Sequence, residues 1–453
     1  MSSRKAENSA RNSSTSESKV SCTVFLRDPR PVLRRTAEHQ LTRFGAFERE
    51  LQVVLPRESH CAVQLTFDSE VEEFRAEFSA FLDENLPPAS ETLERPRSVS
   101  HMPQWARDWQ RLLFDNGWLL PSQPPEFGGR NASVIQQFVY LEELSRRRIY
   151  HSFNPQGVNI VGASLLSFGS DEQKRRWAVP ILRAEITASL GMSEPSAGSD
   201  LASLRTRAVR DGDHFVVNGQ KVWTSGAHDA DVLLTFVRTN PDAPKHKGIS
   251  ALIIPTDTPG LVRRPFPSIC DIDDLDFNEV FFTDVRVPAE NLVGELDQGW
   301  RVANGSLGHE RTMMWLGFAD RLENMIDDFH PGTEVERDQY ASTIMDKQAL
   351  RLLGSAALAR AARGEDDVAA ISVLKLLGSE AELRGMELAL TSAGSEGLVH
   401  PGLTGPYAHM NLDHYFASWF ERYARSFSGT IAGGTSEIQR NIIAQRVLGL
   451  PRG

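Results

Sequence analysis

The sequence has few cysteines, no long hydrophobic run and no excess of basic residues. Its three cysteines, Cys22, Cys61 and Cys270, show neither a zinc-ligand spacing nor a disulfide framework, which fits a reducing, cytoplasmic environment. No apolar run approaches the roughly 20 residues that cross a bilayer, so we expect no membrane span. The net charge of −11 argues against nucleic acid as the main partner, because phosphate contacts require clustered Lys and Arg. We therefore expect a cytoplasmic protein with no metal site and no nucleic-acid partner.

The beginning of the chain differs from the rest in charge and composition. Residues 1–60 hold eleven Lys or Arg against seven Asp or Glu, and the first twenty residues include seven serines with hardly any large apolar side chain. Such a segment cannot bury enough apolar surface to fold by itself. We expect residues 1–64 to form a disordered N-terminal extension. A transit peptide is the less favoured alternative, because Glu7, Glu17 and the missing amphipathic stripe argue against it.

The remaining chain is long enough for two or three domains, and its pattern changes twice. Residues 65–188 show apolar side chains at helical spacing, which predicts a helical domain. Residues 189–290 contain β-rich runs separated by Gly, Pro and Asp, and the pair Asn218-Gly219 indicates a hairpin turn. Residues 291–453 return to long helices rich in Leu, Ala and Arg. We expect an α+β protein with these three domains in this order.

Two segments of the β-rich region have the composition of a binding site for a flat ligand. Small residues and hydroxyls dominate Leu190–Asp200, so its backbone can approach a ligand closely and offer hydrogen-bond donors. Lys221–Ala227 places a tryptophan beside two hydroxyls. A planar heterocycle with polar edges, such as a flavin, suits both segments. The alternative is that each is an ordinary connection between strands, and composition by itself favours that alternative.

A third segment, Ile431–Arg440, places two glycines before a helix. Free N–H groups and a nearby hydroxyl at a helix start can hold an anion. The alternative is that Gly433 and Gly434 only cap the helix.

Taken together and in their order along the chain, these segments resemble the acyl-CoA dehydrogenase family, FAD enzymes that oxidise acyl-CoA thioesters to enoyl-CoA. The resemblance covers about residues 65–453. The matching segments are Gly169–Trp177, Leu190–Asp200, Lys221–Ala227, Glu279–Pro288, Asn291–Glu295, Gly434–Arg440 and Leu448–Pro451. The resemblance implies an N-terminal all-α domain, a middle β-barrel or sandwich domain and a C-terminal four-helix bundle. It also implies α,β-dehydrogenation of an acyl-CoA to the trans-2-enoyl-CoA, with an electron-transfer flavoprotein as electron acceptor.

The resemblance also implies roles for single residues. The loop that contains Leu190, Met192 and Ser193 contacts the flavin ring, with Ser193 on the pyrimidine edge. Ser199 lies where the family contacts the CoA pantetheine or phosphate as well as the cofactor. In the next segment Trp223 lies against the ring system, Thr224 follows it, and Ser225 holds the position that often donates to flavin N5. Five further residues are implied to contact the FAD of a neighbouring subunit: Gly394, Gly397, Thr435, Ser436 and Glu437. The Gly434 backbone is expected beside the substrate.

Dehydrogenation requires a base for the weakly acidic α C–H, so a carboxylate must lie beside it in a dry pocket. Many family members place this glutamate directly before the Gly-Thr of the closing motif, where this chain has Gly433. Some members place it on an earlier helix, and here Glu310 precedes Arg311 at that position. The resemblance therefore implies Glu310 as the base and Arg311 as its neighbour at the substrate. The alternative is an ordinary exposed Glu-Arg pair on a helix.

A second departure concerns assembly. Family homotetramers usually carry Arg-x-x-Phe-Gly after the catalytic helix, where this chain has His330-Pro331-Gly332 and a shortened connection. This resembles the heteromeric acyl-CoA dehydrogenases of actinobacterial steroid breakdown, in which two different chains share each FAD. A homo-oligomer and a heterotetramer with a paralogous chain both stay open. So do two alternatives to catalysis by Glu310: a non-catalytic half-site subunit, and a flavin monooxygenase on the same fold.

Overall fold

The fold comes from a computed structural model, which describes residues 22–23, 64–65, 67–270, 275–306, 308–365, 368–402, 408–410 and 417–451. For residues 22–23, 64–65, 306, 308–312 and 368 the description covers the backbone alone. The chain divides into two units, residues 1–77 and residues 78–453. In the first unit, strand β1 (Cys22–Thr23) pairs antiparallel with β2 (Gln64–Leu65). Most of the predicted disordered extension, residues 1–64, lies outside the described residues.

The first part of the larger unit is helical. Helix α3 begins at a capping box, in which the Ser133 hydroxyl accepts from the Gln136 N–H and the Gln136 side chain accepts from the Ser133 N–H. Two stretches are wound as π-helix, a form that is rare and frequently found near functional sites. The helices of this region are α1 (Ser69–Asn85, which begins in the first unit), α2 (Gln104–Asp115), α3 (Val134–Arg147), η4 (Gly157–Gly162), α4 (Ala163–Phe168), α5 (Asp171–Gln173), η5 (Lys174–Ala178) and α6 (Val179–Leu182).

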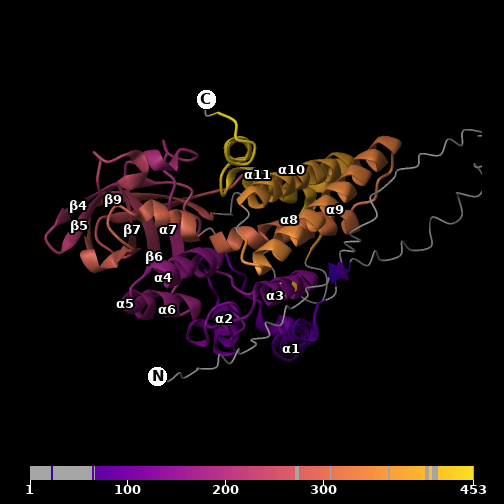
Figure 1. Cartoon of the computed structure of the whole chain (residues 1–453), viewed down its shortest axis with the longest axis horizontal. Coiled ribbons are helices and arrows are strands. Elements are labelled where there is room, and N and C mark those ends of the chain that lie inside the picture. The colour runs from indigo at the N-terminus through magenta and orange to yellow at the C-terminus, as the bar shows by residue number, and fades with distance from the viewer. Residues whose placement is uncertain are drawn as a thin grey trace, which may run out of the picture. The chain divides into compact units, whose positions relative to one another are not determined.

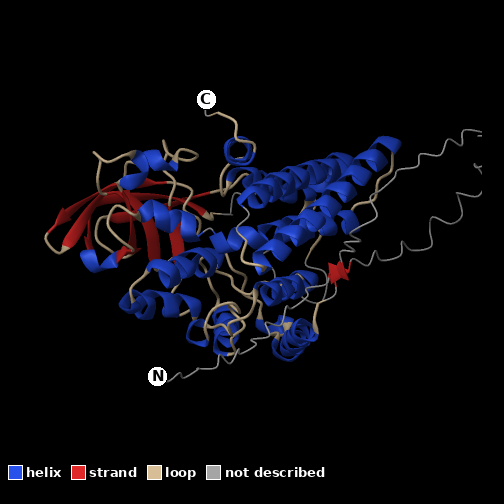
Figure 2. Ribbon diagram, in the orientation of Figure 1, coloured by secondary structure: helices blue, strands red, loops and turns tan. Residues whose placement is uncertain are grey.

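The middle of the chain forms an eight-stranded mixed sheet (Figure 2). The strand order is β10-β7-β6-β4-β5-β9-β8, and β3 pairs parallel with β6. Its strands are β3 (Ala188–Gly191), β4 (Arg207–Asp211), β5 (His214–Lys221), β6 (Val232–Arg238), β7 (Ile249–Pro255), β8 (Leu261–Phe266), β9 (Phe277–Pro288) and β10 (Leu292–Val293).

Strand β6 is buried on both faces, because alternate side chains enter two different cores. Leu234 and Phe236 join a core that includes Leu165 of α4, Ile181 of α6 and Val302 of the following helix α7 (Gly299–Ser306), so these three helices cover one face of the sheet (Figure 1). The intervening β6 side chains pack into a second core with strands β5, β7 and β9.

The hairpin predicted at Asn218-Gly219 is wrong. Strand β5 continues through both residues, and the two-residue turn lies earlier, between Asp211 and His214, with Gly212 at φ +63°. Asn218 instead exchanges two hydrogen bonds with Asp284 on β9. Gly219 forms a bulge at φ +148°, where a Cβ would lie 2.6 Å from the Thr206 Cα. The glycine therefore serves a close backbone approach rather than a turn.

The C-terminal part is a bundle of four long helices, in which α10 packs against α8, α9 and α11. Close packing uses glycines: a Cβ on Gly354 would lie 2.2 Å from the Trp315 ring, and one on Gly378 would lie 2.6 Å from the Phe318 ring. The helices are α7 (Gly299–Ser306), α8 (Gly308–Asp328), α9 (Glu334–Ala362), α10 (Val368–Ala393), η9 (Gly394–Leu398), α11 (Trp419–Ile431), α12 (Ser436–Ile442) and η11 (Ile443–Val447). Among the helices that the structure describes, none has the length and apolar character needed to cross a membrane.

Candidate active site

The two segments predicted to contact a flavin lie against each other in the structure. Strand β3 ends at Gly191, and the chain then turns so that the Ser193 carbonyl accepts a hydrogen bond from the Val222 N–H at 3.0 Å. Leu190 and Met192 are half-buried and pack on the core beneath the sheet. Further along the loop Ser199 is exposed, as a residue that meets a large substrate should be.

A buried ion pair joins the same two segments. Lys221 has no exposed surface, and its Nζ donates to Glu194 Oε1 at 2.9 Å and to the Met192 carbonyl at 3.0 Å. The Glu194 carboxylate also accepts from the backbone N–H groups of Arg205 and Thr206, at 2.6 and 2.8 Å. Burial lowers the pKa of Lys221 to about 8, against the opposing attraction of Glu194. Burial raises the pKa of Glu194, but Lys221 and the hydrogen bonds outweigh it, so that pKa is lowered.

Trp223 occupies an unusual backbone conformation. Its φ is +60°, in the left-handed region, which is an outlier for a bulky side chain and costs on the order of 1–3 kcal/mol. The indole is 60% exposed, and the rings of Phe266 and Phe277 meet it edge-on at centroid distances of 5.3 and 5.5 Å. A strained backbone that holds a large aromatic ring at the surface indicates a binding site, because packing gains little from this arrangement.

The two hydroxyl residues after this tryptophan are held by neighbouring strands. The Thr224 N–H donates to the Asn278 carbonyl at 3.2 Å, yet the fully buried Thr224 Oγ1 has no hydrogen-bond partner among the described residues. The Ser225 carbonyl accepts from Ser189 Oγ at 2.6 Å, and Ser189 in turn contacts the Gln156 side chain. The Thr224 hydroxyl has no exposed surface, so a ligand does not reach it in this conformation. The exposed indole and the half-buried Ser225 fit a flat heterocycle such as a flavin.

The closing motif forms a turn and a short helix. Gly433 and Gly434 have φ values of +68° and +98°, and the Thr435 hydroxyl caps α12 by accepting from the Ile438 N–H at 3.3 Å. Lys375 on α10 donates from Nζ to the Gly434 carbonyl at 2.8 Å, and burial lowers the pKa of this lysine.

The residues after Thr435 include one buried hydroxyl and one exposed carboxylate. Ser436 is 3% exposed, and in the part of the chain that the structure describes its Oγ has no hydrogen-bond partner. Glu437 is exposed, and the hydrogen bonds of its own backbone N–H and of Thr435 hold its pKa below the usual value. Gly394, at φ +55°, begins η9 directly after α10, and Gly397 in the same turn is buried. Helix η9 contacts both α10 and α11.

The predicted base and its neighbour, Glu310 and Arg311, belong to helix α8, but their side chains lie outside the described part of the chain. Positions near them are described. A Cβ built on Gly433 would have the Met314 Cε, at 4.0 Å, as its nearest neighbour. Residues 310 and 314 lie on the same face of a helix because they are four positions apart. The space in front of Gly433 therefore opens toward the face of α8 that carries position 310.

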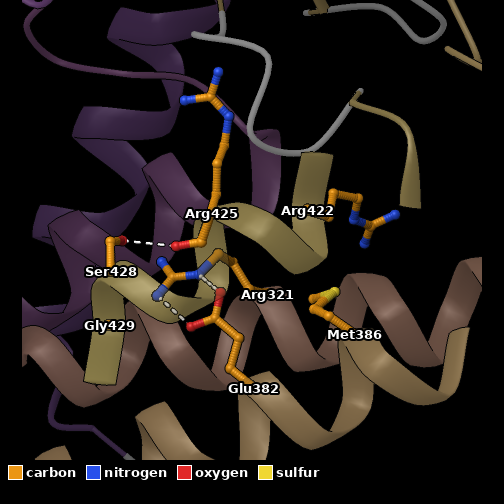
Figure 3. A pocket seen from close by; sticks show the side chains of 7 residues that line it. All are labelled: Arg321, Glu382, Met386, Arg422, Arg425, Ser428 and Gly429. Carbon is orange, nitrogen blue, oxygen red and sulfur yellow. Dashed lines mark hydrogen bonds and ion pairs between the residues drawn. The ribbon is translucent and has the colours of Figure 1, made fainter. Parts of the chain in front are cut away.

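One pocket in the helix bundle does not involve the predicted residues. It has a volume of about 240 Å³ and is lined by Arg321, Glu382, Met386, Arg422, Arg425, Ser428 and Gly429 (Figure 3). The Arg321 guanidinium grips the Glu382 carboxylate with two bonds of 2.5 and 2.9 Å, while the Arg425 guanidinium points away from that pair. Because this lining contains none of the motif residues, we assign the pocket to bundle packing.

Comparison with known proteins decides the family. Models of the acyl-CoA dehydrogenase N-terminal, middle and C-terminal domains match residues 68–185, 189–285 and 297–448. The chain belongs to the acyl-CoA dehydrogenase family. The predictions of this family, of its fold and of an oxidoreductase enzyme are thereby confirmed. Membership in the family implies an FAD cofactor.

Several known proteins resemble this acyl-CoA dehydrogenase over nearly their whole length. Acyl-CoA dehydrogenase IpdE1 of Mycobacterium tuberculosis is 36% identical over 397 residues, which cover 84% of this chain and 98% of that protein. Acyl-CoA dehydrogenase FadE29 of the same organism is 34% identical, and the alignment covers 84% of this chain and 97% of that protein. Among solved structures, the Tcur3481-Tcur3483 steroid ACAD aligns with a TM-score of 0.69 at 30% identity, covering 86% of this chain and 99% of that chain. The ChsE4-ChsE5 complex from Mycobacterium tuberculosis aligns with a TM-score of 0.67 at 28% identity, covering 86% of this chain and 100% of that chain.

The structure also reveals residues of this acyl-CoA dehydrogenase that were not predicted. Glu194 and Lys221 belong to the predicted segments, but no motif role identified them as an ion pair. Phe266 and Phe277 flank Trp223 from strands β8 and β9. The only signal in the sequence was the presence of a charged pair within two segments otherwise made of small, hydroxyl and aromatic residues.

Proposed function

We propose that this protein dehydrogenates an acyl-CoA thioester at the α,β position, with Glu310 removing the α proton. The observation that carries the proposal is the arrangement around Gly433. The position where many family members carry the base has no side chain here, and it faces Met314 on α8, one turn from position 310. A carboxylate at 310 would therefore approach the same space from the opposite wall.

The residues near Glu310 would border the substrate. Arg311, the next residue, would lie beside the substrate. The backbone of Gly434, fixed by its bond from Lys375, would border the thioester.

FAD would be held by the two segments that the structure joins. Leu190, Met192 and Ser193 would contact the ring from one side, and Trp223 would lie against it from the other. Ser225 would meet a polar ring atom, with Thr224 beside it in the wall of the site, and Ser199 would reach the CoA part of the substrate. When bound, the flavin supplies at N5 the acceptor for the β hydride, and an electron-transfer flavoprotein would then take up the electrons.

The residues of the closing motif and of η9 would complete the FAD site of a neighbouring chain: Gly394, Gly397, Thr435, Ser436 and Glu437. We infer that this neighbour is a paralogous chain, because two similar structures are described as pairs of different chains, Tcur3481-Tcur3483 and ChsE4-ChsE5. Exposed apolar side chains on the adjoining elements α11 and η9 support an interface there; they are Leu398, Val399, Phe427 and Ile431. A homo-oligomer is the other outcome.

The substrate class to test first is a steroid side-chain thioester, because one similar structure is named a steroid ACAD. Straight-chain and branched acyl-CoA thioesters complete the panel.

The test uses the purified assembly and Glu310→Gln. We expect the variant to retain its flavin and its affinity for acyl-CoA but to lose about 100- to 10,000-fold in turnover, which is the usual contribution of a positioned base. Glu310→Gln combined with Gly433→Glu should recover part of the activity, because the new carboxylate enters the same space. Turnover of Glu310→Gln at the wild-type rate would refute the assignment. If the wild-type assembly turns over none of the thioesters, the chain is better described as a non-catalytic half-site subunit. This is the second candidate function, and the absence of a carboxylate at Gly433 supports it.

A further inference from the structure

The ion pair between Glu194 and Lys221 has no assigned role, although it joins both segments of the proposed flavin site. We propose that these two residues are positioning residues, whose pairing fixes the loop of residues 190–200 against strand β5. The pair thereby sets where Ser193 and Trp223 meet the flavin. This inference rests on the proposed FAD-dependent function.

The contacts of the pair reach both ends of the loop. Lys221, the last residue of β5, holds the Met192 carbonyl just before the flavin-edge residue Ser193. Glu194, the residue after Ser193, is bound by Lys221 on one side and by the N–H groups of Arg205 and Thr206 on the other. Ser193 is therefore flanked by two anchored neighbours, and its own carbonyl is held by the Val222 N–H.

Most of the rest of the loop is exposed, but Ala197 is buried in the core that the sheet shares with α4, α6 and α7. Pro195, Ser196, Gly198 and Ser199 lie at the surface, and a tight turn connects Glu194 with Ala197 through two backbone hydrogen bonds of 3.1 and 3.0 Å. A short exposed turn of small residues does not define its own orientation. Its orientation relative to the sheet therefore depends on the anchors at Met192 and Glu194 together with the buried Ala197.

The same geometry explains why a charged pair is used in a buried place. A buried ion pair contributes little net stability compared with apolar side chains of the same size, but removal of one partner leaves an uncompensated charge. Such pairs are therefore better suited to defining a geometry than to stabilising a fold. Here the hydrogen bonds of the pair reach the Met192 carbonyl in the loop and the N–H groups of Arg205 and Thr206, which follow the loop.

The experiment compares Glu194→Gln, Lys221→Met and the double variant with the wild type, in the assembly that binds FAD. The deflavinated protein is titrated with FAD, and the midpoint potential of the bound flavin is measured. We expect each single variant to weaken FAD binding by about tenfold, which equals roughly 1.4 kcal/mol and lies within the coupling range of contacting residues. Glu382→Gln, which breaks a comparably buried carboxylate pair in the helix bundle, should leave FAD affinity and potential unchanged.

The double variant separates positioning from a merely structural role. It contains no unpaired buried charge, so its stability in urea should recover relative to the single variants. Its FAD affinity should stay weakened and its potential shifted, because no ammonium holds the Met192 carbonyl. Wild-type FAD affinity in the single variants, or affinity that recovers in the double variant together with stability, overturns the proposal.

A second measurement keeps the inference independent of the proposed cofactor. In Lys221→Met, amide hydrogen exchange across residues 190–206 should be faster than in the wild type, whereas Glu382→Gln should not change it. Unchanged exchange there refutes the positioning role. If the wild-type assembly binds no FAD at all, the proposed function fails, while this exchange measurement still decides the role of the pair.

Discussion

The unpaired hydroxyl of Thr224 leads to a prediction in which a variant stabilises the free protein and leaves FAD affinity unchanged. Thr224→Val keeps the shape of the side chain and removes the hydroxyl. Thr224 is fully buried, and its Oγ1 has no hydrogen-bond partner among the described residues. Leaving such a group unsatisfied costs about 1–3 kcal/mol. The valine variant should therefore stabilise the deflavinated protein by an amount in this range.

FAD binding should not change, because a bound flavin does not reach a hydroxyl that has no exposed surface. Ser225 provides the contrast: it is half-buried, and a neutral hydrogen bond contributes about 0.5–1.5 kcal/mol, so Ser225→Ala should weaken FAD affinity by roughly two- to tenfold. Urea unfolding of the deflavinated protein measures the first effect, and FAD titration measures the second.

Thr235 on β6 provides a matched control. It is equally buried, its hydroxyl is also without a hydrogen-bond partner in the described part of the chain, and it belongs to neither flavin segment. Thr235→Val should stabilise the free protein without changing FAD affinity. The reasoning fails if Thr224→Val destabilises the deflavinated protein or weakens FAD binding, or if Ser225→Ala binds FAD as tightly as the wild type.

Three further predictions follow from the structure. Trp223→Gly relieves a left-handed backbone and removes little buried surface, so it should weaken FAD binding without lowering the urea midpoint of the deflavinated protein; a marked loss of stability would contradict this. Bonds from Ser392 and from the backbone of Thr333 and Gly332 lower the pKa of Glu336 to about 2, so its stabilising effect is complete above its unfolded pKa and is lost as pH falls toward 2. Urea midpoints of Glu336→Gln and wild type should therefore differ at pH 7 and converge near pH 2. A difference that stays constant with pH would refute the stabilising role of the ionised Glu336. Arg321→Met should destabilise the bundle by about 3–5 kcal/mol because it leaves the buried Glu382 unpaired, and adding Glu382→Leu should restore stability; no recovery in the double variant would contradict the assignment.

Much of the fold could be predicted because its signals are local. Strands β6 and β7 are short apolar runs bounded by Gly, Pro and Asp, and the long helices repeat their apolar residues at helical spacing. The wrong hairpin shows where such signals fail. Asn218-Gly219 has the composition of a turn, but the partner strand β9 and the nearby Thr206 backbone require an asparagine and a glycine inside a strand.

The site could be predicted only where its residues lie next to one another in the sequence. The motif segments were identified from their composition and resemblance, and the hydrogen bond from Val222 to Ser193 shows that they meet. The pairing of Glu194 with Lys221 depends on two charges 27 positions apart, which no local pattern connects. The left-handed backbone of Trp223 was also not predictable, because a tryptophan normally avoids that conformation.

The central claim is that a carboxylate at position 310 removes the α proton of a bound acyl-CoA. Anaerobic mixing of the assembly with substrate, followed by the bleaching of the flavin absorbance in a stopped-flow instrument, measures that step in a single turnover. The account predicts rapid bleaching in the wild type and a rate lower by about 100-fold or more in Glu310→Gln, at unchanged substrate affinity. Bleaching of the variant at the wild-type rate would contradict it.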